Sequence, residues 1–269
     1  MTKAPRSPRL ALALVAVCAF TGCAPHAHRA LDLDAGSRHE RYLAALGPRE
    51  ERAASLDAEI ALWLRGASVG TLPGVLGDLR IGAPDTFRLR VRSPLGTAFE
   101  VGGRADRLVA LLPSRRWFLE ASDAGESLGV PNPGEFVVRT CAAAWRPPEE
   151  AWAGASWQGD LRIVRWVEHG DSLRLSVNSA GLPVEVERAR TGRGALRIGY
   201  AEWSRDRVAW PARFEIEAGE SSARLTCRVE RTHIPAAHDP EHFRVAPPAH
   251  AERLAWPDVM NAFAHETSP

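Results

Sequence analysis

DTFRLRVRSPLGT, residues 85–97, carries the clearest structural signal in this chain of 269 residues. Phe87, Leu89 and Val91 alternate with arginines, which is the period of two expected of a β-strand with one buried face. Strands of this kind belong to antiparallel sheets that are covered on their apolar side. The Ser-Pro-Leu-Gly that follows is a turn sequence, so the chain is expected to return here as a second strand.

The same alternation recurs along the rest of the chain and extends the sheet. Turn signals such as Gly102-Gly103, Gly170-Asp171 and Ala218-Gly219 separate about ten or eleven expected strands. Because a single sheet of that length must curl and needs a cover, we predict a mainly β fold with helical cover (α+β). The expected architecture is a curved antiparallel sheet or half-barrel of about eleven strands, with helices plugging its apolar concave face. The apolar positions of the later strands are Leu173, Leu175, Val177, Val184, Val186, Phe214, Ile216, Leu225, Cys227 and Val229.

The central helix of the cover is expected between Asn132 and Trp145. Asn132 suits the N-cap, Pro133 the first helical position, and Glu135 the first turn, where a carboxylate is favourable. The helix should end before Arg146, which two prolines follow.

An N-terminal helical region is expected from Ser37 to Leu64, with an interruption at Gly47-Pro48. In its second half Leu56, Ile60 and Trp63 recur at spacings of four and three residues. This spacing predicts an apolar stripe that packs on another element.

Cys23 is expected to be the first residue of the mature protein. It follows a basic start, an apolar run from Leu10 to Phe20 and the small pair Thr21-Gly22, which is the order of a secretory signal peptide. The site resembles the lipobox of bacterial lipoproteins, in which the cysteine is acylated. The other interpretations are an ordinary signal peptide and a membrane-spanning helix, but the run is shorter than the roughly 20 residues that spanning needs. We therefore predict a lipoprotein signal peptide over residues 1–22, lipidation at Cys23, and a tether over residues 23–36.

One domain is expected over residues 37–250, and a C-terminal tail over residues 251–269 could form a short helix. The chain has 34 Lys and Arg against 33 Asp and Glu. Loss of Lys3, Arg6 and Arg9 with the signal peptide leaves the mature body with a net charge of −2. This balance suggests no nucleic-acid partner.

Two cysteines remain once Cys18 leaves with the signal peptide and Cys23 carries lipid. Cys141 and Cys227 could form one disulfide in an oxidising compartment, or they could be two buried free thiols. The sequence gives no distance between them, so it favours neither alternative.

No motif in the sequence indicates catalysis. It contains no Walker or His-Glu-x-x-His motif. His233, His238 and His242 have a spacing that could bind zinc, but the prolines among them favour a solvated loop. We therefore expect no enzyme activity, no metal site and no cofactor.

Four segments, taken in order, carry a family resemblance. The first runs over residues 65–97 and ends in the strand and turn quoted above, and the second is the Asn132–Trp145 helix. The third is the strand at residues 196–203, and the fourth is a return strand at residues 210–216 that begins Trp-Pro-Ala. Together they resemble the LolB family of outer-membrane lipoproteins, while the ending through Pro247-Pro248 is closer to LolA-like carriers. The chain is thus similar to the LolB/LolA-like superfamily of lipoprotein-localisation factors.

The resemblance implies a half-barrel around an apolar cavity that accepts the acyl chains of other lipoproteins. It implies a LolA-like periplasmic carrier and lipoprotein cargo as partners, and insertion of that cargo into the outer membrane without nucleotide or covalent chemistry. Pro94, Leu95 and Gly96 correspond to the family's membrane-facing loop, although Leu95 could instead fold back on the core. Ala24 after Cys23 favours export, so we expect a lipid-anchored monomer in the cell envelope, on the periplasmic side of the outer membrane.

The cavity of such a protein would be lined by inward-facing apolar residues, which could equally be ordinary core. Two other functions stay open: a lipid- or glycolipid-binding envelope lipoprotein with another cargo, and a structural envelope lipoprotein without an open cavity. The predicted lining residues are Phe87, Leu89, Phe99, Phe136, Trp145, Leu175, Ile198, Phe214 and Leu225.

Overall fold

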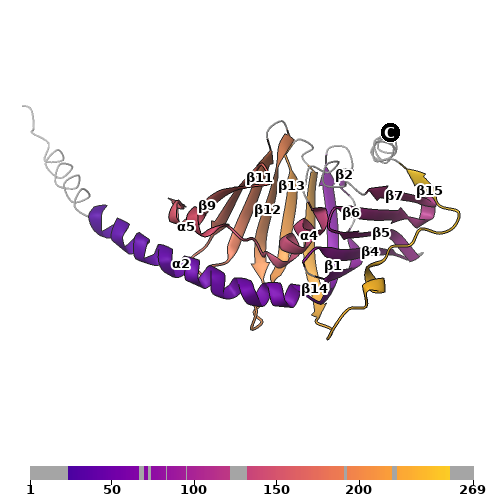
Figure 1. Ribbon diagram of the computed structural model, residues 1–269, viewed down its shortest axis with the longest axis horizontal. Coiled ribbons are helices and arrows are strands. Elements are labelled where there is room, and N and C mark those ends of the chain that lie inside the picture. The colour runs from indigo at the N-terminus through magenta and orange to yellow at the C-terminus, as the bar shows by residue number, and fades with distance from the viewer. Residues whose placement is uncertain are drawn as a thin grey trace, which may run out of the picture.

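A computed structural model of the chain describes residues 24–66, 70–71, 74–82, 84–94, 96–121, 132–190, 193–219 and 223–254. Within these ranges the chain forms one sheet of fifteen strands, and three α-helices pack on one of its faces (Figure 1). We call this the inner face and the opposite one the outer face. The helices, which we call the helical cover, are α2 (Ala24–Ala53), α4 (Pro133–Ala142) and α5 (Glu149–Ala153).

The strands follow the chain in hairpins, so neighbours in sequence are mostly neighbours in the sheet. Their spatial order is β15-β7-β6-β5-β4-β3-β1-β14-β13-β12-β11-β10-β9-β8, and β2 adds to β1. Every pairing is antiparallel except that of β15 with β7. The strands are β1 (Leu56–Gly66), β2 (Gly70–Thr71), β3 (Val75–Gly82), β4 (Thr86–Ser93), β5 (Gly96–Arg104), β6 (Arg107–Leu112), β7 (Trp117–Ala121), β8 (Ser156–Gln158), β9 (Leu161–Glu168), β10 (Asp171–Val177), β11 (Pro183–Arg190), β12 (Arg193–Trp203), β13 (Pro211–Ala218), β14 (Ala223–His233) and β15 (Glu252–Leu254).

The mainly β fold with helical cover is confirmed, but the expected number of about eleven strands is wrong. Three of the additional strands, β2, β8 and β15, have only two or three residues, too few to show an alternating pattern. The sheet is also open, because its edge strands β15 and β8 do not pair with each other. Twist between strands accommodates its length, so it does not curl into the expected half-barrel (Figure 1).

The N-terminal region differs from the expectation in both halves. Helix α2 continues through Gly47-Pro48, and its first turns include the segment expected to be a tether. The second half is not a helix, because residues 56–66 form the central strand β1, which pairs with β3 and β14. Leu56 and Ile60 are four residues apart, a spacing that places them on one face of either a helix or a strand.

Helix α4 begins where the sequence places it, but it ends at Ala142, three residues before the expected Trp145. The Asn132 side chain accepts a hydrogen bond from the Glu135 backbone N–H at 3.1 Å, which confirms the N-cap. The helix docks closely on the sheet, since the Gly134 N–H donates to the Ala105 carbonyl at 3.0 Å. A Cβ at Gly134 would lie 2.0 Å from the Asp85 carbonyl oxygen, so only glycine fits at this contact.

Residues 234–251, which we call the strap, lead from β14 across the outer face to β15 and include the short 3₁₀ helix η2 (Pro240–Phe243). A second 3₁₀ helix, η1 (Pro113–Arg115), connects β6 to β7. The strap packs closely on the sheet where the strands carry glycines, with Phe243 over Gly82 and Val245 over Gly102. Strand β15 therefore lies in the segment expected to be a tail, while residues 255–269 fall outside the described part of the chain.

No helix in the described ranges is both long enough and apolar enough to cross a membrane. The predicted signal peptide and Cys23 lie outside the described residues, so lipidation stays a prediction.

Candidate functional site

The inner face of the sheet is a continuous apolar floor beneath the helical cover. Leu175, Val186 and Ile198 are fully buried on neighbouring strands, and Phe214 is 4% exposed. They form one cluster with Trp145, which follows α4 and is 2% exposed. The main core of the protein is therefore the contact between sheet and cover.

A short chain of hydrogen bonds runs through this core and joins α2, α4 and the sheet. The Tyr42 hydroxyl on α2 donates to the Trp145 carbonyl. Trp145 Nε1–H donates to the Tyr200 hydroxyl at 2.9 Å, and that hydroxyl donates to the Thr140 carbonyl at 3.1 Å. Burial raises the pKa of both tyrosines, so both stay neutral donors.

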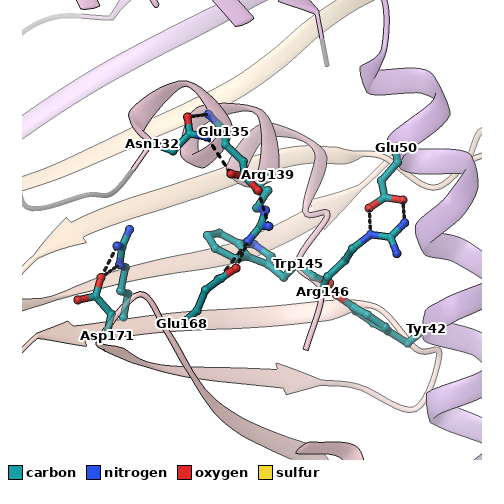
Figure 2. Close-up of polar contacts among 10 residues, drawn as sticks. Tyr42, Glu50, Asn132, Glu135, Arg139, Trp145, Arg146, Glu168 and Asp171 are labelled. Atoms are coloured by element: carbon teal, nitrogen blue, oxygen red, sulfur yellow. Dashed lines mark hydrogen bonds and ion pairs between the residues drawn. The ribbon is translucent and has the colours of Figure 1, made fainter. Parts of the chain in front are cut away.

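Ion pairs hold the cover at its margin (Figure 2). Arg139 on α4 lies between Glu135, one turn earlier, and Glu168 at the end of β9, 3.0 Å away. Arg146 reaches from the segment after α4 to Glu50 on α2 through two hydrogen bonds. These pairs are partly solvated, and exposed pairs of this kind contribute about 0.2–1 kcal/mol each. The margin of the cover is therefore held more weakly than its apolar centre.

The space left between sheet and cover is small. A pocket of about 30 Å³ lies beside α4 and is lined on its apolar side by Phe136, Trp145 and Leu173. Such a volume holds about one water molecule. In the part of the chain that the structure describes, an acyl chain can thus enter the space beneath α4 only if part of the cover moves.

The predicted lining residues are divided between two clusters of the core. Trp145, Leu175, Ile198 and Phe214 are buried in the cluster under α2 and α4. Phe87 belongs to a smaller cluster with Leu108, Ala110 and Leu119. The other predicted lining residues are half-buried: Leu89, Phe99, Phe136 and Leu225. Contact with acyl chains stays a prediction for the whole set.

One end of the inner face is charged, which the sequence analysis did not predict. Asp171 is completely buried and forms ion pairs with Arg188 and Arg190, as Figure 2 shows in part. Burial alone would raise the pKa of Asp171, but hydrogen bonds from the two arginines lower it overall. The sequence of β11 could have predicted this charged end, because Arg188 and Arg190 occupy the same alternating, inward-facing positions as Val186.

Arg49 on α2 is the second charged residue that the sequence analysis missed. Its side chain is completely buried, although no sequence pattern distinguishes it from the other arginines of the helix. Its guanidinium carbon lies 5.6 Å from the ring centroid of Tyr42 and 5.5 Å from that of Trp203. Desolvation lowers the pKa of this guanidinium.

The predicted membrane-facing loop joins β4 to β5. Pro94 and Gly96 are exposed, and Leu95 lies outside the described residues. Its role in delivery therefore stays a prediction.

The outer face carries an open groove of about 1110 Å³ between the strap and strands β3–β6. His238 in the strap is 3.5 Å from Asp57, and its ring centroid is 6.3 Å from that of His242. His233 is the last residue of β14. In the described ranges no three His, Cys, Asp or Glu side chains are grouped so as to hold a metal ion.

Cys141 and Cys227 are two buried free thiols in this structure, so of the two alternatives the disulfide is not formed. Burial raises the pKa of the Cys141 thiol to about 12 and that of Cys227 well above its usual value.

Comparison with known proteins finds no matching family model and no matching curated protein. Among solved structures, a LolA superfamily protein from Nitrosomonas europaea superposes with a TM-score of 0.51 at 12% identity, over 74% of this chain and 97% of the other. A domain described as an outer membrane lipoprotein-sorting protein from Vibrio parahaemolyticus gives 0.50 at 12% identity, over 75% and 95%. The fold is thus similar to that of a LolA superfamily protein, in agreement with the sequence resemblance.

Proposed function

We propose that this protein binds the acyl chains of lipoproteins between the inner face of its sheet and its helical cover. In this proposal it is anchored through acylated Cys23 in the outer membrane, receives cargo from a LolA-like periplasmic carrier, and helps insert that cargo into the membrane. The process involves transfer between apolar environments and no covalent chemistry.

The observation that carries the proposal is the apolar floor on a LolA-type sheet. The floor spans β1, β3 and β9–β14 and packs against helices rather than against a second sheet. An acyl chain offers the same aliphatic surface as the helix side chains, so it can replace them on the floor and keep the floor covered from water.

Two opposing energies decide this exchange. Each methylene that leaves water contributes roughly 0.8 kcal/mol, so a chain of sixteen carbons gains on the order of 10 kcal/mol. Lifting part of the cover opposes this gain, because it removes side chains such as Tyr42 and Leu46 from the same floor. A near balance of the two energies would suit a protein that must later release its cargo to a bilayer.

The test is transfer of an acylated lipoprotein from a LolA-type carrier to this protein and on to vesicles, with native mass spectrometry of the complex. The protein would start at residue 23 with Cys23→Ala. We expect a one-to-one complex, and we expect Leu95→Glu to weaken delivery to vesicles. Leu76→Glu is the matched control, because Leu76 is an exposed leucine on the outer face of β3.

Binding of lipid without transfer would favour an envelope lipoprotein with another lipid or glycolipid cargo. Absence of any acyl binding would favour a second candidate, a structural envelope lipoprotein. That candidate draws its support from the 30 Å³ pocket, since the cover leaves almost no space above the floor.

A further inference from the structure

Arg49 is the most unusual polar side chain in the core. It is completely buried, yet none of its three guanidinium nitrogens has a hydrogen-bond partner in the described part of the chain. Its contacts are the faces of Tyr42 and Trp203. A desolvated cation normally requires a counter-charge or several acceptors, because burial of an unpaired charge costs several kcal/mol.

The neighbouring Arg52 shows how the same helix satisfies an arginine. Arg52 also lies over an indole ring, 5.3 Å from the centroid of Trp210. It donates to the Thr232 hydroxyl at 2.7 Å and lies 3.6 Å from the Asp206 carboxylate. Arg49, one turn earlier, has the aromatic contacts but no oxygen partner among the residues that the structure describes.

A second unmet donor lies nearby on the same side of the cover. Trp152 is buried on α5 with its Nε1–H unpaired, and its ring centroid is 5.2 Å from that of Tyr42. The Tyr42 ring thus contacts both Arg49 and Trp152, and the Tyr42 hydroxyl already donates its hydrogen bond to the Trp145 carbonyl. This part of the core offers hydrogen-bond donors and a positive charge without the matching acceptors.

We propose that Arg49 binds the anionic oxygen group of an acyl amphiphile, a carboxylate or a phosphate, when the acyl chain lies on the inner face. The inference rests on the acyl binding of the proposed function and not on its lipoprotein cargo, because the ligand reaches Arg49 only after the cover has moved. A guanidinium binds either anion through two parallel hydrogen bonds, and the interaction is strong where water is excluded. Desolvation lowers the pKa of Arg49 and the nearby Glu50 only partly opposes this, which agrees with a cation that has no hydrogen-bonded counter-ion in the described part of the chain.

The experiment compares three ligands that share a sixteen-carbon chain: palmitate, hexadecyl phosphate and uncharged hexadecanol. Affinities for the protein from residue 23 onward (Cys23→Ala) would be measured by titration calorimetry below the micellar concentrations. We expect at least one of the two anions to bind about tenfold more tightly than hexadecanol, and we expect this preference to disappear in Arg49→Met. Which anion binds more tightly separates a fatty acid from a phospholipid as the source.

Two further variants keep the test decisive. Arg49→Lys retains the charge and should retain part of the preference, and Arg52→Met should retain all of it. Without ligand, Arg49→Met should raise the melting temperature, because an apolar side chain replaces an unpaired buried charge. A lower melting temperature with an unchanged preference would show that Arg49 has only a structural role.

The outcomes separate this inference from the function on which it rests. Equal binding of all three ligands by the unmodified protein would overturn the role of Arg49 and leave acyl binding intact. Binding of none of them would overturn both.

Discussion

Asp171 and Arg49 are both completely buried charged residues, and they differ in their partners. Asp171 forms ion pairs with two arginines, whereas Arg49 lies against two aromatic faces and has no hydrogen-bond partner in the described part of the chain. A buried charge with its counter-charges is a structural element, because removal of one partner leaves the others uncompensated. A buried charge without them is a candidate for binding.

The first prediction concerns Asp171→Asn. The variant leaves Arg188 and Arg190 without their shared carboxylate, so we expect it to lower the free energy of unfolding by about 3 kcal/mol at pH 7. Urea unfolding followed by circular dichroism measures this. A loss below about 0.5 kcal/mol would show that the three charges are solvated.

The same residue predicts how stability depends on pH. The pKa of Asp171 is lower in the folded state than in the unfolded chain, so its contribution is complete above the unfolded pKa of roughly 3.9. The contribution is lost as the pH falls from there through the folded pKa. The difference in unfolding free energy between the native protein and Asp171→Asn should therefore shrink below about pH 4, and a constant difference would contradict the assignment.

The second prediction concerns the thiols of the mature body with Cys23→Ala. With the pKa of Cys141 near 12 and that of Cys227 also raised, neither thiolate forms at pH 8. Ellman's reagent should detect no thiol in the native protein and two after unfolding without reductant. Detection of none after unfolding would instead demonstrate a disulfide.

At this scale the sequence predicts what local chemistry determines. Asn132 was recognised as an N-cap because its partner, Glu135, is three residues away. Arg49 could not be recognised, because its burial depends on Trp203, which is distant in sequence and meets it only in the folded molecule.

Among the elements, β1 shows that the spacing of apolar residues alone cannot always distinguish a helix from a strand. A spacing of four residues fits both a helix and a strand. The pattern of Leu56, Ile60 and Trp63 predicts a helix, but these residues form a strand. Leu56, Ala58 and Ile60 are in fact the buried series. The strand is stabilised by pairing with β14, about 165 residues further along the chain, and no local pattern contains that information.

Helix α2 differs from its expectation for a related reason. Gly47-Pro48 predicted an interruption, but the helix continues and buries Tyr42, Leu46, Arg49 and Ala53 along one face. Packing of this face on the sheet outweighs the local preference of glycine and proline.

The third prediction tests the docking of α4 by paired glycine substitutions. Gly134→Ala introduces a methyl group where the Asp85 carbonyl lies, so we expect a loss of about 2–3 kcal/mol as the helix is displaced. Gly47→Ala on α2 meets no atom within 4 Å and should stabilise the protein by about 1 kcal/mol, because alanine favours the helix. Thermal and urea unfolding of both variants would check this. A Gly134→Ala variant as stable as the native protein would show that α4 does not depend on this close contact.

At the scale of the whole molecule, the alternating strands and capped helix sufficed to predict a mainly β fold with helical cover. The strand order could not be predicted, because the strap carries the chain from β14 across six strands to one edge of the sheet. Glycines at 82 and 102 make room for Phe243 and Val245 of the strap, and only the folded sheet reveals this complementarity.

The filled inner face makes movement of the cover the central requirement of the proposed function. The ion pairs of Arg139 and Arg146 hold the margin of the cover, while apolar contacts fill its centre. Acyl binding should therefore be slow relative to diffusion, because it waits for the cover to open.

The fourth prediction tests directly whether acyl chains bind on the inner face. Palmitate brominated along its chain quenches the fluorescence of tryptophans that it contacts, and Trp145 lies on the inner face while Trp63 lines a groove on the outer face. We predict that brominated palmitate quenches the native protein, and that Trp145→Phe removes more of this quenching than Trp63→Phe does. Quenching that is lost in Trp63→Phe but kept in Trp145→Phe, or no quenching at all, would contradict binding between the sheet and its cover.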